Sequence, residues 1–535
     1  MPAMLLSLRF TVVFAFALVA IAAFGSGHRA FAADFTVTKT ADTADGTCDA
    51  DCSLREAVIA ANGAAGNDTI TVPSGTFSLT IAGGGENNAA TGDLDISFDA
   101  LTINGGGLAN TTIEVGAGDD RVFEIVSGSA TIADLEIRNG RGDSGFGCEC
   151  GGGILVRSGA NLTLVNTGVG GNTATGGGLS AGGGIQNDGT LTLTNSFVSG
   201  NTADFAGGIN NGAGAFLIMN GGAVEQNTAV TNVGGIELPP GSTSTITSAL
   251  ISRNTAAGIG GIDVSGTLTL RDSIVNQNTA TGGNSGGLEV SGGALTVVLS
   301  TIVNNTASGD GGAIFSNGDV TLTNSTITGN TAGGLGGAIL NNVVANLTST
   351  NTTIAGSSPD GIHNFGTAAL KNTIVANSTG AECAGAAAVI SSGHNLASDN
   401  SCGLGGAGDV PNRDPMLGAL ASNGGPTQTH ALLAGSPAID AGDNAGCPAT
   451  DQRGFAPPAD GDGNGSAVCD IGAYEAGIVA QTTAPTPSPT QVPADLPALG
   501  GSMGGRSGMH WLLATALILG VAVAGVTAVR MLRHM

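Results

Sequence analysis

A tripeptide, Asn-Thr-Ala, recurs through the middle of the chain at nearly constant intervals, and this repeat limits the possible folds more than any other feature. The successive spacings are 29, 26, 27, 24, 27 and 25 residues, and a pair of glycines leads from each copy into the next unit. Periods of this length are typical of solenoids, in which each repeat is one coil of chain. The copies begin at Asn172, Asn201, Asn227, Asn254, Asn278, Asn305 and Asn330.

Apolar and polar residues alternate within a single unit as they do in a β-strand. Leu191 and Leu193 alternate with Thr192 and Thr194, which places the leucines inside and the threonines outside. Such strands are three to five residues long and are separated by Gly or Asn, so no crossover helix fits between them. The sequence therefore predicts an all-β, right-handed parallel β-helix with three short strands per turn, in which stacking buries the inner face. Eight turns between residues 151 and 360 would span roughly 40 Å.

The repeated corner asparagines are predicted to be structural. Asn tolerates the left-handed backbone conformation of tight turns, and stacked Asn side chains can hydrogen-bond to one another. Repetition in every turn predicts a structural role for these asparagines, so we disfavour a role in binding sugar or metal. One ladder would consist of Asn172, Asn201, Asn254, Asn278 and Asn330, and a second, interrupted at Leu299, of Asn166, Asn195, Asp272, Asn324 and Asn351.

The composition agrees with thin stacked layers and excludes one class of partner. Aromatic residues make up 3% of the chain and Gly accounts for 92 of 535 residues, so the core must consist of Val, Ile, Leu and Ala rather than large rings. The net charge is -25 and the only lysines are Lys39 and Lys371. Binding of nucleic acid needs clustered Lys and Arg, so we expect no nucleic-acid partner.

Two short segments resemble a family of surface proteins. Residues 311–314 and 336–339 both read Gly-Gly-Ala-Ile, which resembles half of the repeat in chlamydial polymorphic membrane proteins. That resemblance implies a β-helical protein of the cell surface.

The segment from Cys52 to Gly63 is predicted to be a helix that caps the open end of the solenoid. Ser53 and Glu56 have the spacing of a capping box, and the apolar residues between Leu54 and Ala61 lie on one face. The motif Cys-Ser-Leu-Arg-Glu-Ala, with the acidic residues before it, resembles the CSLREA domain. This resemblance implies a bacterial or archaeal surface protein and a cap at 33–66, followed by the β-helix at 67–410.

A non-repetitive module is expected at 411–476. It contains the segments Asp414–Gly418, Asp451–Gly454 and Cys469–Glu475, which resemble the region called choice-of-anchor Q. That region closes β-helical surface proteins just before a variable anchor.

The two ends of the chain carry export and anchoring signals. Arg9, an apolar run from 10 to 24 and the tripeptide at 30–32 predict a signal peptide at 1–32, and an uncleaved N-terminal anchor is the alternative. A Pro-, Thr- and Gly-rich linker at 477–510 precedes an uncharged segment, 511–529, which is long enough to cross a bilayer. The basic tail at 530–535 favours the cytoplasmic side, so the N-terminal ectodomain would lie outside, with the membrane as a partner.

The anchor has a second interpretation. Residues 496–500 resemble the LPxTG motif of sortase substrates, which implies a processed anchor, but Leu499 stands where that motif has Thr. We therefore predict a retained transmembrane helix.

Eight cysteines fall into close pairs, which predicts local disulfides in an exported protein. Zinc is the competing interpretation, but no pair has CxxC spacing and the six histidines are scattered. The pairs are Cys48 with Cys52, Cys148 with Cys150, Cys383 with Cys402, and Cys447 with Cys469.

One acidic loop matches the first half of a calcium-binding loop. Asp460, Asp462 and Asn464 alternate with Gly and precede a turn glycine. The twelfth position is Ile471, so Asp470 or Glu475 would have to supply the remaining carboxylate. Calcium here and a plain Asp/Gly turn are both open, and no other cofactor is expected.

The enzyme question depends on one acidic stripe. Glu237, Asp263 and Glu289 follow successive Gly pairs at matching places, and aligned carboxylates can catalyse glycoside hydrolysis. We favour exposed acids on an outer strand, because the stripe has no basic residue in register and no aromatic platform. The sequence thus predicts a non-catalytic surface protein, adhesin-like or structural in the envelope, with a glycan or a surface protein as its ligand. A polysaccharide lyase or glycoside hydrolase is the alternative.

Overall fold

The computed structural model describes residues 32–97, 100–116, 118, 120–142, 150–176 and 180–478. Residues 1–31 of the predicted signal peptide, nearly all of the linker, the predicted span at 511–529, the basic tail at 530–535 and Cys148 lie outside these ranges. Within them, no helix is long and apolar enough to cross a membrane.

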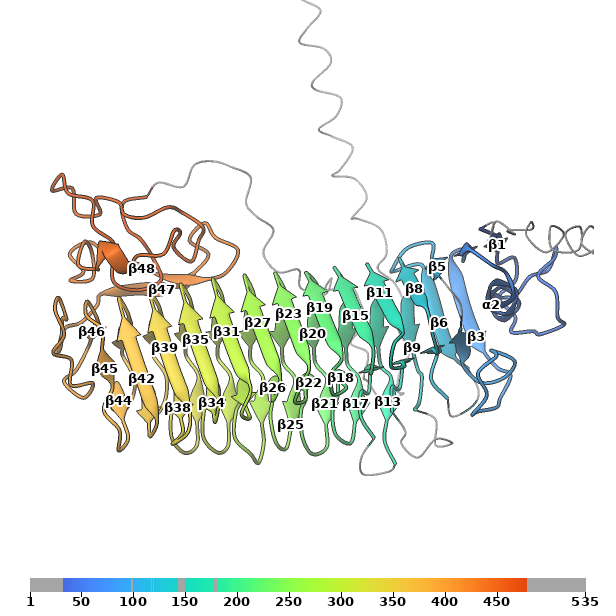
Figure 1. The fold of residues 1–535 in the computed structure, drawn as a ribbon, viewed down its shortest axis with the longest axis horizontal. Coiled ribbons are helices and arrows are strands. Elements are labelled where there is room, and N and C mark those ends of the chain that lie inside the picture. Colours follow the sequence, from blue (N-terminus) through green and yellow to red (C-terminus); the bar gives the residue numbers. More distant parts are fainter. Residues whose placement is uncertain are drawn as a thin grey trace, which may run out of the picture. The chain divides into compact units, whose positions relative to one another are not determined.

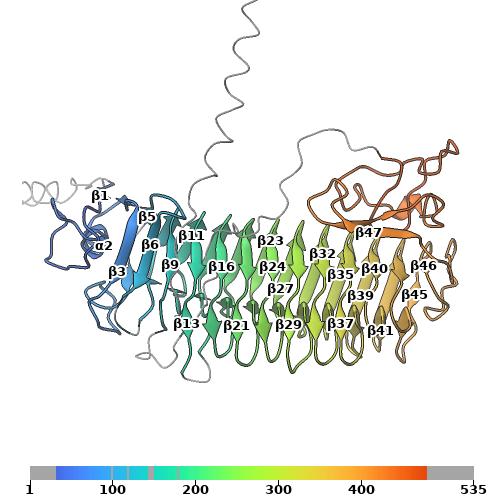
Figure 2. The same ribbon diagram turned by 180° about the vertical axis from the view of Figure 1, so that it is seen from behind.

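The described chain coils so that each turn adds one strand to each of several parallel sheets (Figure 1, Figure 2). We name these sheets A to D, and a central turn visits them in the order C, A, B, D. Among the described residues sheet A has 14 strands, sheet B 13, sheet C 12 and sheet D 7. The predicted parallel β-solenoid is confirmed.

Sheets A and C carry the surfaces discussed below. Sheet A consists of β1 (Asp34–Thr36), β2 (Asn67–Thr71), β5 (Ala100–Asn104), β8 (Ser129–Ala133), β11 (Asn161–Val165), β15 (Thr190–Thr194), β19 (Phe216–Asn220), β23 (Thr243–Thr247), β27 (Thr267–Arg271), β31 (Ala294–Val298), β35 (Asp319–Thr323), β39 (Asn346–Thr350), β42 (Thr367–Lys371) and β45 (Ile390–Ser391). Sheet C consists of β4 (Leu94–Ile96), β7 (Phe123–Ile125), β10 (Ile154–Val156), β14 (Ile185–Asn187), β18 (Ile209–Asn211), β22 (Ile236–Leu238), β26 (Ile262–Val264), β30 (Leu288–Val290), β34 (Ile314–Ser316), β38 (Ile339–Asn341), β41 (Ile362–Asn364) and β44 (Cys383–Ala384).

Sheets B and D complete each turn. Sheet B consists of β3 (Gly75–Leu79), β6 (Thr111–Val115), β9 (Glu136–Arg138), β12 (Gly168–Gly170), β16 (Phe197–Ser199), β20 (Ala223–Glu225), β24 (Leu250–Ser252), β28 (Ile274–Asn276), β32 (Thr301–Val303), β36 (Thr326–Thr328), β40 (Thr353–Ala355), β43 (Ile374–Ala376) and β46 (Leu396–Ala397). Sheet D consists of β13 (Thr173–Ala174), β17 (Thr202–Ala203), β21 (Thr228–Ala229), β25 (Thr255–Ala256), β29 (Thr279–Ala280), β33 (Thr306–Ala307) and β37 (Thr331–Ala332). Three strands per turn were predicted, and sheet D adds a fourth because Thr-Ala of each repeat pairs with the next copy.

The core follows the predicted alternation. Leu191 and Leu193 of β15 are fully buried and pair in register with the leucines of β11 and with Leu217 and Met219 of β19. Stacked aliphatic residues of this kind supply the burial that no single turn can achieve alone. Eight steps lead from β10 to β41 along sheet C, so the predicted eight turns between residues 151 and 360 are confirmed.

The first asparagine ladder is continuous and fully buried. The backbone N–H and the Nδ2 of Asn254 both donate to Oδ1 of Asn278, at 3.0 and 2.9 Å, and Nδ2 also donates to the carbonyl of Val224 at 2.9 Å. The same pattern links every copy of the repeat, including Asn227 and Asn305, which the predicted ladder omitted. Each amide thus pairs with a backbone N–H and a backbone carbonyl of the preceding turn.

The prediction of a second hydrogen-bonded asparagine ladder is wrong. No side-chain hydrogen bond joins its five members to one another within the described ranges. The column instead shares a left-handed backbone: Asn166, Asn195 and Asp272 have φ of 46°, 47° and 49°, and Leu299 follows at 53°. Asn and Asp are common there because they tolerate this conformation better than other side chains, and Leu299 does not interrupt the column.

Paired glycines precede the sheet C strands from β10 to β38 and allow neighbouring turns to approach closely. A Cβ added to Gly207 would lie 2.6 Å from the carbonyl oxygen of Gly234. A side chain at this corner would therefore separate the stacked backbones, which explains the predicted small-residue turn.

Helix α2 (Leu54–Gly63) lies at the start of the sheets and contacts β1, β2 and β4. Both hydrogen bonds of the Ser53–Glu56 capping box are present. Arg55 is fully buried, pairs with both carboxylate oxygens of Asp42 at 2.7 and 3.2 Å, and donates to three carbonyls of the segment 89–93. Arg55, the arginine of the Cys-Ser-Leu-Arg-Glu-Ala motif, thus has a structural role: it joins α2 to Asp42 and to the segment 89–93.

The C-terminal module contains an antiparallel pair, β47 (Leu417–Ala421) and β48 (Thr429–Leu432), and the 3₁₀ helix η2 (Asn444–Gly446). It lies along the corner between sheets A and B. Gln452 Nε2 donates to the carbonyl of Ser300 at 3.2 Å, Thr326 donates to Gln452 Oε1 at 2.6 Å, and Asn372 Oδ1 accepts from the backbone of Asp443 at 2.9 Å. With the bond from the backbone N–H of Ala473 to Thr353 Oγ1 at 3.1 Å, they fix the module to four consecutive turns.

Three of the predicted disulfides are present, joining Cys48 to Cys52, Cys383 to Cys402, and Cys447 to Cys469. The fourth predicted pair includes Cys148, which lies outside the described residues. The confirmed bonds staple the two ends of the fold, since they belong to the entry of α2, the last turns and the C-terminal module.

Candidate functional site

The stripe of Glu237, Asp263 and Glu289 forms as predicted on sheet C. Each acid is the middle residue of a three-residue strand, flanked by apolar neighbours that enter the core, so its side chain leaves the core. Glu237 is in register with Asp263, and Asp263 with Glu289. Asn232 Nδ2 donates to Glu237 Oε2 at 3.0 Å, and the Ser265 and Ser291 hydroxyls donate at 3.3 Å to Asp263 and Glu289.

The expectation that these acids are exposed is wrong. Glu237 is 8% exposed and Asp263 6% exposed, and Asn232, in the loop just before β22, contacts Glu237. Oδ1 of Asp263 is buried without a hydrogen-bond partner. Glu237 and Asp263 are therefore covered carboxylates and Glu289 is half-buried, so the stripe is not an open acidic face.

Burial raises the pKa of all three acids, and repulsion from Asp263 adds to the rise at Glu237 and Glu289. Burial, and then the negative charge of Asp263, raises the pKa of Glu237 to about 8 and that of Glu289 to about 7. Burial also raises the pKa of Asp263. A row that retains protons near neutral pH has the capacity for general acid or base chemistry.

The register of sheet C brings a ring and a histidine into this column, contrary to the sequence analysis. Phe315 is in register with Glu289, and His363 follows two turns later. The His363 ring lies 2.8 Å from Asp360 and its centroid lies 4.9 Å from that of Phe365. Phe315 is 8% exposed, so it offers no open platform on which a sugar ring could stack.

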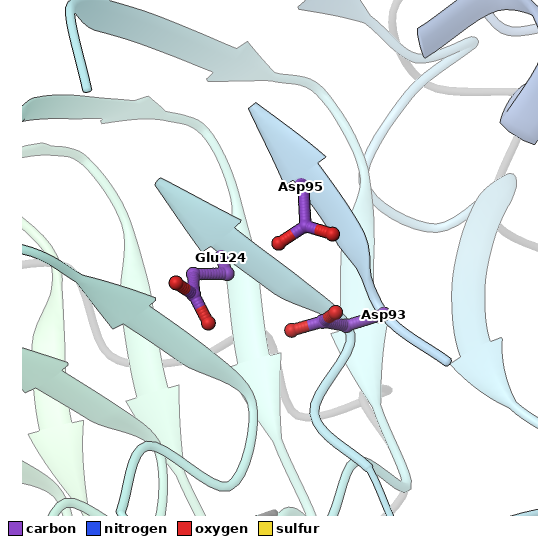
Figure 3. Close-up of side chains that lie close together, drawn as sticks. All are labelled: Asp93, Asp95 and Glu124. Carbon is purple, nitrogen blue, oxygen red and sulfur yellow. The ribbon is translucent and has the colours of Figure 1, made fainter. Parts of the chain in front are cut away.

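A second acidic group, missed by the sequence analysis, occupies the beginning of the same column. Asp93, Asp95 and Glu124 each offer a carboxylate oxygen, and these oxygens lie within 4.8 Å of one another (Figure 3). Asp95 of β4 is in register with Glu124 of β7. Arg121 Nη1 donates to Asp93 at 3.3 Å and to Glu124 at 2.7 Å, and Glu124 also pairs with Arg157.

A sequence signal for this second group existed. Leu94-Asp95-Ile96 and Phe123-Glu124-Ile125 have the same apolar–acid–apolar form as Ile236-Glu237-Leu238, but they lie outside the Asn-Thr-Ala repeats that defined the register. All three acids are buried. Burial, and then the charge of Asp120, raises the pKa of Asp93 to about 9, and burial raises the pKa of Asp95 to about 7.

The predicted calcium loop is compact and exposed. Asp460 Oδ1 and Oδ2 accept from the backbone of Gly463, Asn464 and Gly465 at 2.8 to 3.0 Å. Asp440, rather than Asp470, joins Asp460 and Asp462 in a group of carboxylates with oxygens within 4.8 Å of one another. Asp470 is buried and accepts from the backbone of Asp440 and Ala476. Calcium at this loop stays a prediction.

The outward face of sheet A carries an uncharged column of threonines. Register places a threonine at the centre of ten of the eleven consecutive strands from β2 to β39, and only Ile218 departs. These residues are half-buried or exposed, in contrast to the sheet C acids. The members are Thr69, Thr102, Thr131, Thr163, Thr192, Thr245, Thr269, Thr296, Thr321 and Thr348.

The comparison with protein-family models agrees with the solenoid fold. The family described as a right handed beta helix region matches residues 122–302, and the fold is a right-handed parallel β-helix. The crystal structure of pectate lyase Pel9A resembles the chain at 14% sequence identity and a TM-score of 0.35, covering 83% of this chain and 96% of that one. No curated protein matches the sequence.

Proposed function

We propose that this chain is a non-catalytic protein of the cell surface, and that its β-helix presents sheet A to a glycan or surface-protein ligand. The observation that carries the proposal is the threonine column. Its hydroxyls recur about 4.8 Å apart from turn to turn, interrupted at Ile218, on a sheet whose parallel strands are paired in register. A rigid row of hydroxyls and methyls is preorganised to bind a repeating partner at low entropic cost.

The charged residues on the outward face of sheet A, such as Arg271 and Asp319, lie outside the central threonine column. The threonine column carries no carboxylate, histidine or base from Thr69 to Thr348, and hydrolysis or elimination needs a group that transfers a proton. Binding without turnover is therefore the role that this surface supports.

Features at both ends support a location outside the cell. Disulfides are typical of exported proteins, and the 511–529 segment is suited to an anchor. We assign α2 the role of the solenoid cap, since an uncovered strand edge promotes aggregation. The CSLREA and choice-of-anchor Q resemblances suit the same arrangement, in which the C-terminal module ends the ectodomain.

Introducing positive charge on one face tests the proposal. The double variant Thr245→Lys with Thr321→Lys alters two exposed positions of the threonine column, and Thr228→Lys with Thr306→Lys alters two exposed threonines of sheet D. Binding of the purified full-length chain to a glycan array and to whole cells is measured for both. The proposal expects binding to be lost in the sheet A variant alone. Equal binding by both variants would reject the threonine column as the contact surface.

A carbohydrate-active enzyme is the second candidate, and the sheet C stripe favours it. Glu237 and Asp263 are adjacent in register, and the raised pKa of Glu237, about 8, suits a general acid. The burial of both acids opposes this role, because a polymer substrate must reach them. Formation of product from a polysaccharide separates the two candidates.

A further inference from the structure

The cluster of Asp93, Asp95 and Glu124 is enclosed by ordered parts of the N-terminal turns. Asp95 and Glu124 leave adjacent strands, and Asp93 ends the segment that crosses over them from β3. Asp95 is fully buried, Glu124 is 1% exposed and Asp93 is 4% exposed. Arg55 of α2 holds the same segment through the carbonyls of Ala89, Gly92 and Asp93. The carboxylates are thus positioned by three separate elements (Figure 3).

Asp95 is the member of the cluster that has a carboxylate oxygen without a hydrogen-bond partner. Its Oδ2 accepts one hydrogen bond, from the backbone of Ala89 at 2.8 Å. Its Oδ1 is buried and has no hydrogen-bond partner. Arg121 contacts Asp93 and Glu124, but no cation of the described chain pairs with Asp95. A buried carboxylate with an open oxygen and acidic neighbours is costly unless a positive charge joins it.

We propose that Asp93, Asp95 and Glu124 bind a divalent cation, and that the cation is Ca²⁺. Three carboxylate oxygens within 4.8 Å of one another form a hard, oxygen-only donor set, which suits Ca²⁺ rather than thiolate- or imidazole-seeking metals. Arg121 and Arg157 orient Glu124 and limit the negative charge of the site. The bound cation would join β4 to β7 and hold the segment before β4, so it would stabilise the N-terminal end of the solenoid.

Calcium-dependent melting of the purified full-length chain tests this site. The loop at Asp460 is first silenced with Asp460→Asn and Asp462→Asn, so that it cannot contribute to the response. Asp95→Asn is then added to that background, because it keeps the shape of the side chain and removes one ligand charge. Both proteins are stripped with a chelator, and melting temperature and calorimetric stoichiometry are recorded as CaCl₂ is added, with MgCl₂ in parallel.

The proposal expects one Ca²⁺ per chain and a rise in melting temperature in the background protein. A Ca²⁺ concentration about 100-fold above Kd favours the folded state about 100-fold. In the Asp95→Asn protein both effects should vanish, while its melting temperature without metal equals or exceeds that of the background. That last readout separates loss of the site from failure to fold. An unchanged response in Asp95→Asn, or no response in the background protein, would overturn the proposal.

Discussion

Individual asparagine side chains carry much of the hydrogen bonding inside the solenoid. Asn254 Oδ1 accepts from both the backbone N–H and the Nδ2 of Asn227, and its own Nδ2 donates twice. Asn254→Ala therefore leaves several buried polar groups unpaired, and we expect it to lower the free energy of unfolding by roughly 3 kcal/mol. Urea unfolding measures this loss.

Asn346→Ala is the matched control for the ladder. Asn346 is exposed and makes one surface hydrogen bond, to Asp319 at 2.8 Å, so its loss should change stability by about 0.5 kcal/mol or less. Similar losses in both variants would mean that the ladder contributes no more than a surface asparagine.

Substitutions at Asn195 measure how much the left-handed backbone conformation of this column contributes to stability. Its φ is 47°, its side chain is exposed, and it makes no side-chain hydrogen bond among the described residues. Asn195→Ala should cost about 1 kcal/mol, because Ala is strained in this conformation, whereas Asn195→Gly should cost little. Thermal melting of the two variants separates backbone strain from lost contacts, which would affect both substitutions equally.

At the scale of the strand, the sequence predicted the register of neighbouring strands better than the burial of their outward side chains. The alternation of Leu191 and Thr192 was sufficient to assign inner and outer faces, and the repeat spacing aligned Glu237 with Asp263. The burial of those acids could not be predicted, because it depends on side chains from turns of variable length, such as Asn232. The cluster at Asp95 was missed for a related reason: its turns carry no Asn-Thr-Ala marker, so no register was available for them.

The sheet C stripe should make stability depend on pH. The pKa of Glu237 rises from 4.5 to about 8 on folding, so folding takes up a proton there. The stabilisation linked to that proton is fully present below about pH 4.5 and is lost as the pH rises through about 8. Glu237→Gln cannot titrate, so its melting temperature should fall less than that of the wild type over this range. Parallel pH profiles of the two proteins would contradict the raised pKa.

At the scale of the whole molecule, each turn of the solenoid contacts only the turns before and after it. Residues 236–261 form one complete turn, from β22 to the residue before β26. Their deletion joins Gly235 to Ile262 and lets Asn227 meet Asn278, so we expect a folded protein whose β-sheet circular dichroism persists and which still melts cooperatively. Deletion of residues 236–248 should abolish folding, because a sheet C position would then lead directly into sheet B. Failure of both deletions would mean that the turns are not interchangeable.

The central claim is that this β-helix binds without catalysis, and a cleavage assay tests it most directly. The purified full-length wild type and Asp263→Asn are incubated with neutral and uronate-containing polysaccharides, with and without Ca²⁺. New reducing ends report hydrolysis, and absorbance of unsaturated products reports elimination. The account predicts no product above the buffer control from either protein. Product from the wild type that disappears in an equally stable Asp263→Asn protein would contradict it and assign catalysis to the sheet C stripe.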